Sequence, residues 1–278
     1  MSLTSPLTSS LTSFGKSKLL IGALTKNNAR FIVGVLKNIE MYASCFQDYQ
    51  CVFIDGGSQD GTQVILKSWC KSDAQRRHII DENVLFPPSQ RAVHDRGNIL
   101  ANARNAVIQL FRPHFDANGV PTYLLLLDTD SVNAKPFNIV QFMTCEAAFI
   151  KHPKCAAVFA NQPTVYYDVW ALRDEKCRTD WQIEWRETGN SQCHKKYQAR
   201  KPPELGLWPV KSAFGGAGLY RTALIPQNAT YICTQIWKAP IGVDYTIPVC
   251  EHVPFHQTFV DAGHELFVNC EWLICDHE

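Results

Sequence analysis

The segment Tyr123–Val132 reads YLLLLDTDSV, and it limits the possible folds more than any other part of the chain. Its unbroken apolar run predicts a strand buried on both faces, which is typical of a parallel sheet covered by helices on both sides. The run ends in Asp128 and Asp130, and two carboxylates at the tip of a buried strand are costly unless something positive binds them. The segment therefore predicts a central strand with a site at its end.

Segments of strand and helix character alternate through the first half of the chain. The expected strands are Lys18–Thr25, Cys51–Asp55, His78–Ile80, the leucine-rich run and Cys155–Asn161. The expected helices cover 28–45, 62–71, 97–111 and 136–150. This order predicts an α/β fold with a mostly parallel twisted sheet and helices on both faces. Ligands of such sheets bind outside the carboxyl ends of the strands, so Thr25, Asp55 and the Asp128/Asp130 pair should share one edge.

Composition excludes several classes of protein. The 278 residues contain 27 Lys plus Arg against 26 Asp plus Glu, so no basic excess suggests a nucleic-acid partner. The apolar runs are too short to span a bilayer, so we expect no stable membrane insertion. Residues 1–17 are rich in Ser, Thr and Leu without the pattern of a signal peptide, and we expect a flexible leader. Residues 18–278 then form one domain, with halves at 18–131 and 132–278.

The chain has 11 cysteines, and none is arranged with zinc-ligand spacing. Several fall inside expected strands or helices, where a free thiol behaves as a small apolar group. Reduced thiols in the cytoplasm are the favoured interpretation. One disulfide among Cys233, Cys250, Cys270 and Cys275 stays open.

Asp128 and Asp130 allow three interpretations. They can be acids at a strand end that are solvated or cap the next turn. They also fit the nucleophile motif of haloacid-dehalogenase-like phosphatases, in which the first Asp attacks phosphorus. The third interpretation is a divalent cation that holds a diphosphate. FIDGGSQDGT after the second strand suits a ribose or base edge, and Arg96 and Arg104 near a helix start suit a diphosphate. These upstream elements favour the third.

The motifs ALTKNN, FIDGGSQDGT, ANARN and LLLLDTDS occur in the order typical of GT-A glycosyltransferases, and the sequence resembles that nucleotide-sugar-dependent family. YYDVWALRD, FGGAGLYR and CEHVPFH are similar to the fungal capsule mannosyltransferase-like group. They are also similar to the capsid-glycan glycosyltransferases of large algal DNA viruses.

The resemblance implies a Rossmann-like nucleotide-binding half and an acceptor-binding half. It implies Mn²⁺ or Mg²⁺, a UDP-sugar donor with a pentose such as xylose or a hexose, and a hydroxyl acceptor on a glycan or glycoprotein. A viral capsid protein is one such acceptor, and the location would then be the host cytoplasm. An inactive sugar-binding module is the non-enzyme alternative.

The resemblance also implies roles for particular residues. The nucleotide-sugar site would comprise Ala23, Leu24, Thr25, Arg30, Asp55, Gly56, Gly57, Arg96, Arg104, Asp128, Thr129, Asp130, Gly215 and Gly216. The metal ligands would be Asp128, Asp130 and His252, with a packing role as the alternative for His252. Pro254 argues against a helical i,i+4 zinc pair of His252 and His256. The reaction would invert the anomeric centre, with Asp244 as the first choice of base and Asp168 as the second.

Overall fold

The computed structural model describes residues 13–85, 96–178, 180–190, 192–238 and 244–277. The strands are β1 (Lys18–Thr25), β2 (Asp48–Asp55), β3 (Arg77–Asp81), β4 (Thr122–Asp128), β5 (Cys155–Asn161), β6 (Leu207–Val210), β7 (Ala217–Arg221), β8 (Thr234–Lys238), β9 (Asp244–Pro248) and β10 (Glu265–Leu273). The helices are α1 (Ala29–Ala43), α2 (Thr62–Lys71), α3 (Glu82–Leu85), α4 (Arg96–Phe111), α5 (Ile139–Lys151), α6 (Trp181–Thr188) and α7 (His252–Asp261). These bounds confirm the predicted alternation of strands and helices, with shifts of a few residues at the ends.

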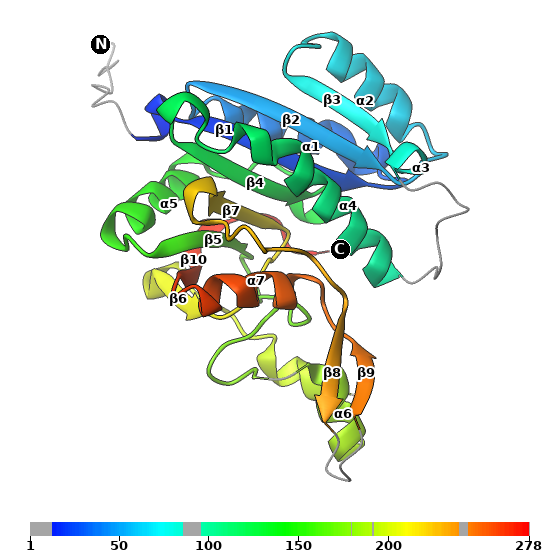
Figure 1. The fold of residues 1–278 in the computed structure, drawn as a ribbon, viewed down its shortest axis with the longest axis vertical. Coiled ribbons are helices and arrows are strands. Elements are labelled where there is room, and N and C mark those ends of the chain that lie inside the picture. The colour runs from blue at the N-terminus through cyan, green and yellow to red at the C-terminus, as the bar shows by residue number, and fades with distance from the viewer. Residues whose placement is uncertain (1–12, 86–95, 179, 191, 239–243, 278) are drawn as a thin grey trace.

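One large sheet has the strand order β3-β2-β1-β4-β7-β5-β10-β6 (Figure 1). Its first four strands are parallel, with Thr25 level with Asp55 and Leu24 level with Asp128. The carboxyl ends of β1, β2 and β4 therefore meet at one edge, as the sequence predicts.

The other half of the sheet is mixed. β7 lies antiparallel between β4 and β5, β10 is parallel to β5, and β6 is antiparallel to β10. The FGGAGLYR segment thus supplies a central strand, which its glycines conceal in the sequence. β8 and β9 form a separate hairpin that extends from one end of the molecule beside α6 (Figure 1).

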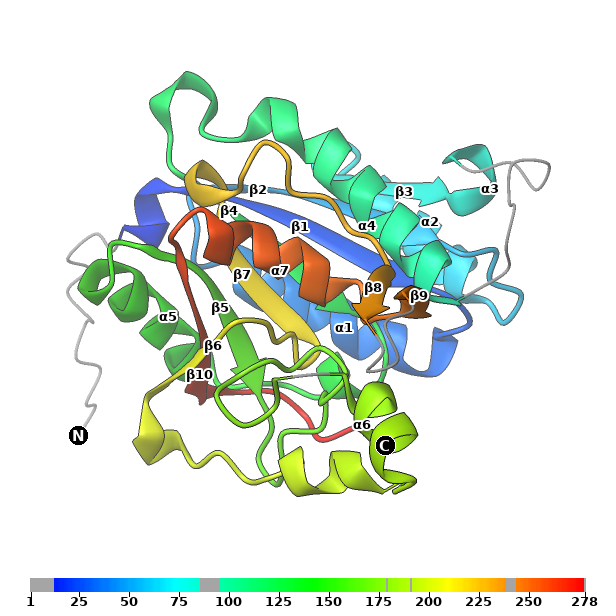
Figure 2. The same cartoon turned by 60° about the horizontal axis from the view of Figure 1, so that its bottom comes forward.

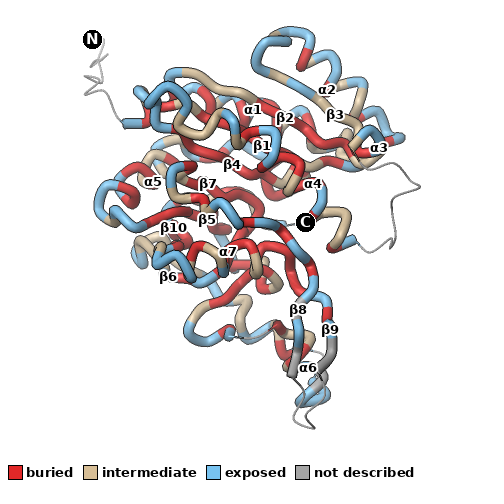
Figure 3. The backbone as a smooth tube through the Cα atoms, viewed as in Figure 1, coloured by how far each residue is buried: buried red, intermediate tan, exposed pale blue. Residues whose placement is uncertain are grey.

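Helices cover both faces of the sheet (Figure 2). Leu125 and Leu127 of β4 pack into the cluster formed with α1, α2 and α5, whereas Leu124 and Leu126 pack into the cluster formed with α4 and α7. All four leucines are buried, so β4 forms the centre of the fold (Figure 3). Burial of each such side chain contributes about 1.5–3 kcal/mol.

The segment 13–17 packs against the domain, unlike the flexible leader expected for residues 1–17. Phe14 is fully buried and stacks on Phe46, and its backbone N–H donates to Glu146 Oε1 at 3.1 Å. Residues 13–17 are therefore part of the packed domain and not of a flexible leader. Residues 1–12 lie outside the described part of the chain.

Among the described residues no disulfide joins any pair of cysteines, including the pairs left open among Cys233, Cys250, Cys270 and Cys275. None of the described helices has the length and apolar character needed to cross a membrane.

Candidate functional site

A cleft of about 780 Å³ opens at the edge where β1, β2 and β4 end. The predicted site residues that line it are Leu24, Thr25, Gly56, Arg96, Arg104, Asp128, Thr129, Asp130, Asp168 and His252. Tyr167, Trp170 and Phe214 add aromatic surface from the second half of the chain. The cleft thus lies where a doubly wound sheet places its ligands.

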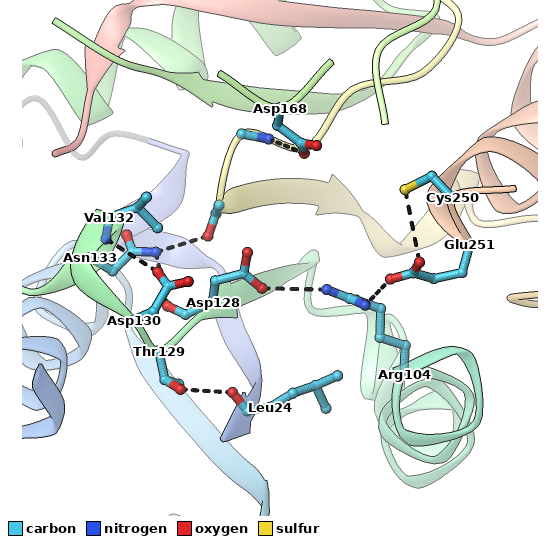
Figure 4. Close-up of polar contacts among 12 residues, drawn as sticks. Leu24, Arg104, Asp128, Thr129, Asp130, Val132, Asn133, Asp168, Cys250 and Glu251 are labelled. Atoms are coloured by element: carbon cyan, nitrogen blue, oxygen red, sulfur yellow. Dashed lines mark hydrogen bonds and ion pairs between the residues drawn. The ribbon is translucent and has the colours of Figure 1, made fainter. Parts of the chain in front are cut away.

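The Asp128–Asp130 turn is held by backbone contacts. The Asp128 N–H donates to Gly216 O at 2.9 Å, and the Thr129 hydroxyl donates to Leu24 O at 2.8 Å. Asp130 Oδ1 accepts from the Val132 N–H at 3.2 Å, which caps the short turn after β4. These bonds fix both carboxylates at the floor of the cleft (Figure 4).

Arg104 lies between two carboxylates. Its Nη2 is 3.4 Å from Asp128 Oδ1, and its Nη1 forms a close ion pair with Glu251. Burial, together with the charges of Asp130 and Asp168, raises the pKa of Asp128, although Arg104 opposes this shift. So many neighbouring acids make the floor a favourable place for a cation.

The wall formed by the loops after β1 and β2 is mainly self-supporting. Asp55 is fully buried, and its carboxylate accepts bonds from the N–H groups of Gly57 and Ser58, from the Ser58 hydroxyl and from the Gln63 amide. These contacts hold Asp55 within its own loop, so Asp55 stabilises the wall. It is not one of the described residues that line the cleft. Gly57, with φ of 78°, allows the turn at this point.

Four other predicted nucleotide-sugar residues lie behind or beside the cleft. Ala23 is buried in the core, and the exposed Arg30 lies over the Phe31 ring at 4.1 Å. Gly215 and Gly216 are buried with φ of 63° and 90°, and a Cβ on Gly215 would lie 2.7 Å from Ala160 O. These two glycines shape the support of the aspartates and do not contact the cleft themselves.

Asp168 faces Asp128 from the opposite wall (Figure 4). Its Oδ2 accepts from the Gly215 N–H at 3.1 Å and its Oδ1 from the Ala171 N–H at 3.3 Å. Burial raises the pKa of this carboxyl group, although the two N–H groups oppose the shift. Asp244, the other candidate base, begins β9, but its side chain lies outside the described part of the chain. Its role stays a prediction.

His252 is not brought to the aspartate pair. The His252 ring stacks on Phe214 at 4.1 Å, and the described residues contain no group of three or more His, Cys, Asp or Glu side chains placed to hold a metal. Burial, then the Arg104 charge, lowers the His252 pKa. Pro254 does not keep His252 and His256 off a common helix, because α7 begins at His252 and a proline in the first turn removes no helical bond. His256 is occupied by Ser212 and Tyr220.

A different late histidine lies near the pair. His277 Nε2 is 4.0 Å from Asp130 Oδ2, and its ring packs against Tyr167. The segment after β10 returns here because the Cys275 N–H donates to Val132 O at 2.9 Å. No local pattern in the sequence marks His277, since its position depends on this pairing between distant segments.

A family model described as cryptococcal mannosyltransferase 1 matches residues 18–257. No curated protein sequence matches the chain. The sequence match therefore covers both halves of the domain and most of the residues that line the cleft.

The chain has the same general fold as a solved mannosyltransferase from Pyrobaculum calidifontis in complex with GDP-Man and Mn²⁺, which is 12% identical with a TM-score of 0.50 and covers 99% of this chain and 61% of that chain. Glucosyl-3-phosphoglycerate synthase from Mycobacterium tuberculosis, in complex with Mn²⁺, UDP and phosphoglyceric acid, is 9% identical with a TM-score of 0.48 over 96% and 72% of the two chains. The chain spans about three fifths of the length of the Pyrobaculum protein. At such identities the likeness to the Pyrobaculum structure shows the fold alone.

Proposed function

The chain belongs to the cryptococcal mannosyltransferase 1 family of glycosyltransferases, and we propose that it transfers a sugar from a nucleoside diphosphate to a hydroxyl group of a glycan acceptor. The observation that carries this proposal is the arrangement of the cleft floor. Asp128 and Asp130 lie on one side, Asp168 lies on the other, and Arg104 lies beside Asp128. A diphosphate needs cationic partners, and an acceptor hydroxyl needs a carboxylate that takes its proton.

The residues around Asp130 fit a divalent cation. Asp130 and His277 are close, both side chains are partly exposed, and Asp128 adds a second carboxylate on the same turn. Carboxylate oxygens with an imidazole nitrogen suit Mn²⁺, and oxygens with water suit Mg²⁺. We assign Asp128 and Asp130 to this cation and propose His277, at 4.0 Å from Asp130, as a further ligand in place of His252; because the described residues hold no three such side chains already placed for a metal, His277 would have to move toward the cation. When bound, the cation would polarise the diphosphate oxygens and make the nucleoside diphosphate a better leaving group.

We assign proton removal to Asp168. Its carboxylate is oriented by the Gly215 and Ala171 N–H groups, and its raised pKa brings its basicity closer to neutral pH. In this reaction the acceptor oxygen forms a bond to the anomeric carbon, the bond from that carbon to the diphosphate breaks, and the hydroxyl proton moves to Asp168. The configuration is inverted. Asp244 stays the alternative base.

The donor and location are also proposals. The family description favours a mannosyl donor, whereas the sequence motifs favoured a UDP-sugar, and both belong in the test. An acceptor on a glycoprotein, including a viral capsid protein, and a cytoplasmic location stay predictions. The phosphatase alternative loses support, because β1, β2 and β3 precede the DTD strand and the family is one of glycosyltransferases.

The decisive experiment incubates the full chain with GDP-mannose and, separately, with UDP-sugars, in the presence and absence of MnCl₂, and measures binding by calorimetry and release of nucleoside diphosphate. We expect binding and release that need the metal. Binding without release for every donor and added glycan would indicate an inactive sugar-binding module. Absence of nucleotide binding would overturn the proposal.

A further inference from the structure

Glu251 is a buried charge with no evident use in its own helix. It is 2% exposed and occupies the residue just before α7, where a short side chain such as Asp, Asn, Ser or Thr ordinarily accepts bonds from the first N–H groups of the helix. Glu251 makes no such capping bond. Its carboxylate turns instead to Arg104, 147 residues away on α4. A buried carboxylate requires a reason, since its desolvation costs several kcal/mol unless it is paired.

The Arg104 guanidinium is fixed on three sides. Glu251 binds Nη1, the Phe214 ring lies 5.3 Å from the guanidinium carbon, and Asp128 lies at 3.4 Å from Nη2. The pair with Glu251 is the close one, and the contact with Asp128 is at the limit of a hydrogen bond. Arg104 is therefore held mainly from the α7 side, away from the aspartate turn.

We propose that Glu251 is a positioning residue that holds Arg104 beside Asp128 without letting the two form a close pair. An unrestrained guanidinium would pair bidentately with Asp128, because this is its preferred geometry with a carboxylate. Asp128 would then be less available to a cation, and Arg104 would be less available to a diphosphate. Glu251 thereby keeps both groups ready for ligands of opposite charge. The inference rests on the proposed function of the cleft.

The test is a double-mutant cycle on the full chain, with Glu251→Gln, Arg104→Gln and the double variant. The measured quantities are the Kd of GDP and of UDP in saturating MnCl₂ and the MnCl₂ concentration that gives half-maximal nucleotide binding. Glu251→Gln should weaken nucleotide binding about ten- to a hundredfold and raise the half-maximal MnCl₂ concentration, because charged hydrogen bonds contribute this much. The double variant should bind no more weakly than Arg104→Gln, because Glu251 acts through Arg104.

The matched control is Glu146→Gln, which neutralises a buried glutamate on α5 that bonds to Ser13 and Phe14. This variant should leave both measurements unchanged, whereas a purely structural effect of neutralising a buried acid would appear in both glutamate variants. Where Glu251→Gln does not fold, Glu251→Asp replaces it in the cycle, with a smaller loss and the same dependence on Arg104.

Additive losses in the double variant, or an unchanged metal requirement in Glu251→Gln, would overturn the inference while wild-type binding still supports the proposed function. Absence of nucleotide binding by the wild type would overturn both.

Discussion

The two walls of the cleft are built differently. The wall from the first half of the chain consists of the loops after β1 and β2, and side chains such as Asp55 and Asn27 bond to groups in these same two loops. The opposite wall brings together Asp168, Phe214 and Glu251 from separate segments of the second half, and their contacts reach residues far along the chain. The first wall therefore supports itself, whereas the second exists only when the whole domain is folded.

This difference predicts how variants behave. A residue of the first wall whose side chain forms its hydrogen bonds within that wall should affect the free energy of unfolding more than the ligand affinity when it is replaced. A charged residue on the floor or on the second wall should affect binding or turnover while the fold persists. Variants of the floor and of both walls test this separation.

Asp130→Ala should abolish transfer and weaken metal-dependent nucleotide binding by about a hundredfold or more. Loss of a direct metal ligand should cost more than loss of a residue that only supports a ligand, which typically costs about 10- to 100-fold. Asp130 is partly exposed but caps the turn after β4, so its removal should lower the free energy of unfolding by only about 0.5–2 kcal/mol while the protein still folds. Calorimetry with MnCl₂ measures the binding. Wild-type affinity in this variant would remove Asp130 from the metal site.

Asp168→Asn should lower turnover by roughly a hundred- to ten-thousandfold, the usual contribution of a positioned base. Nucleotide affinity should hardly change, because the residue faces the acceptor in our assignment. Asp244→Asn is the paired variant. A large loss of turnover in Asp244→Asn with normal turnover in Asp168→Asn would transfer the role of base to Asp244, and an anomeric configuration retained in the product would remove the need for either.

Asp55→Asn should lower the free energy of unfolding by about 1–3 kcal/mol, because the Gly57 and Ser58 N–H groups and the Gln63 amide donate to a charged acceptor. The affinity of the folded fraction for nucleotide should be close to that of the wild type. Urea denaturation and calorimetry measure the two quantities. Lost affinity with unchanged stability would mean that Asp55 contacts the nucleotide directly and that the walls are alike.

Acid should destabilise the second half through His256. Burial, and to a lesser degree Arg104, lowers its pKa to about 3 in the folded protein, against about 6.5 when unfolded. Between pH 6.5 and pH 3 the unfolded state binds a proton on His256 that the folded state does not. The contribution of His256 to the free energy of unfolding is therefore full above pH 6.5 and falls by about 1.4 kcal/mol per pH unit between pH 6.5 and pH 3.

Urea denaturation at pH 7 and pH 5.5 checks this prediction. His256→Gln should lose part of the wild-type pH dependence, and the surface variant His152→Gln serves as the control because His152 is only half-buried beside Glu265. Equal pH dependence in His256→Gln and the wild type would contradict the assignment.

The first half of the fold was predictable because its information is local. The apolar run of β4, the alternating segments before it and the glycines after β2 each identify their element without reference to distant residues. The family resemblance likewise predicted glycosyltransferase membership, which the family match confirms. Arg104, Asp128 and Asp130 were predicted to act together, and they lie together in the cleft.

The second half of the fold was harder to predict from the sequence, because its elements depend on pairings between distant segments. β7 looks like a glycine-rich turn until β4 and β5 are beside it. His277 reaches Asp130 only through the pairing of Cys275 with Val132, and Glu251 reaches Arg104 only because α7 and α4 share one face of the sheet. A single sequence shows which residues can carry charge, but not which of them the sheet order brings together.

The position of β7 also has a consequence for synthesis on the ribosome. β4 is complete at Asp128. One of its edges pairs with β1, but the other pairs with β7, which is complete only at Arg221. Translation of the intervening residues takes roughly 5–20 s at about 5–20 residues per second. During that interval a leucine-rich strand presents unpaired N–H and C=O groups, which other chains can join. The nascent protein is therefore most prone to aggregation after residues 18–131 have emerged, and slower translation between β4 and β7 should lower its soluble yield.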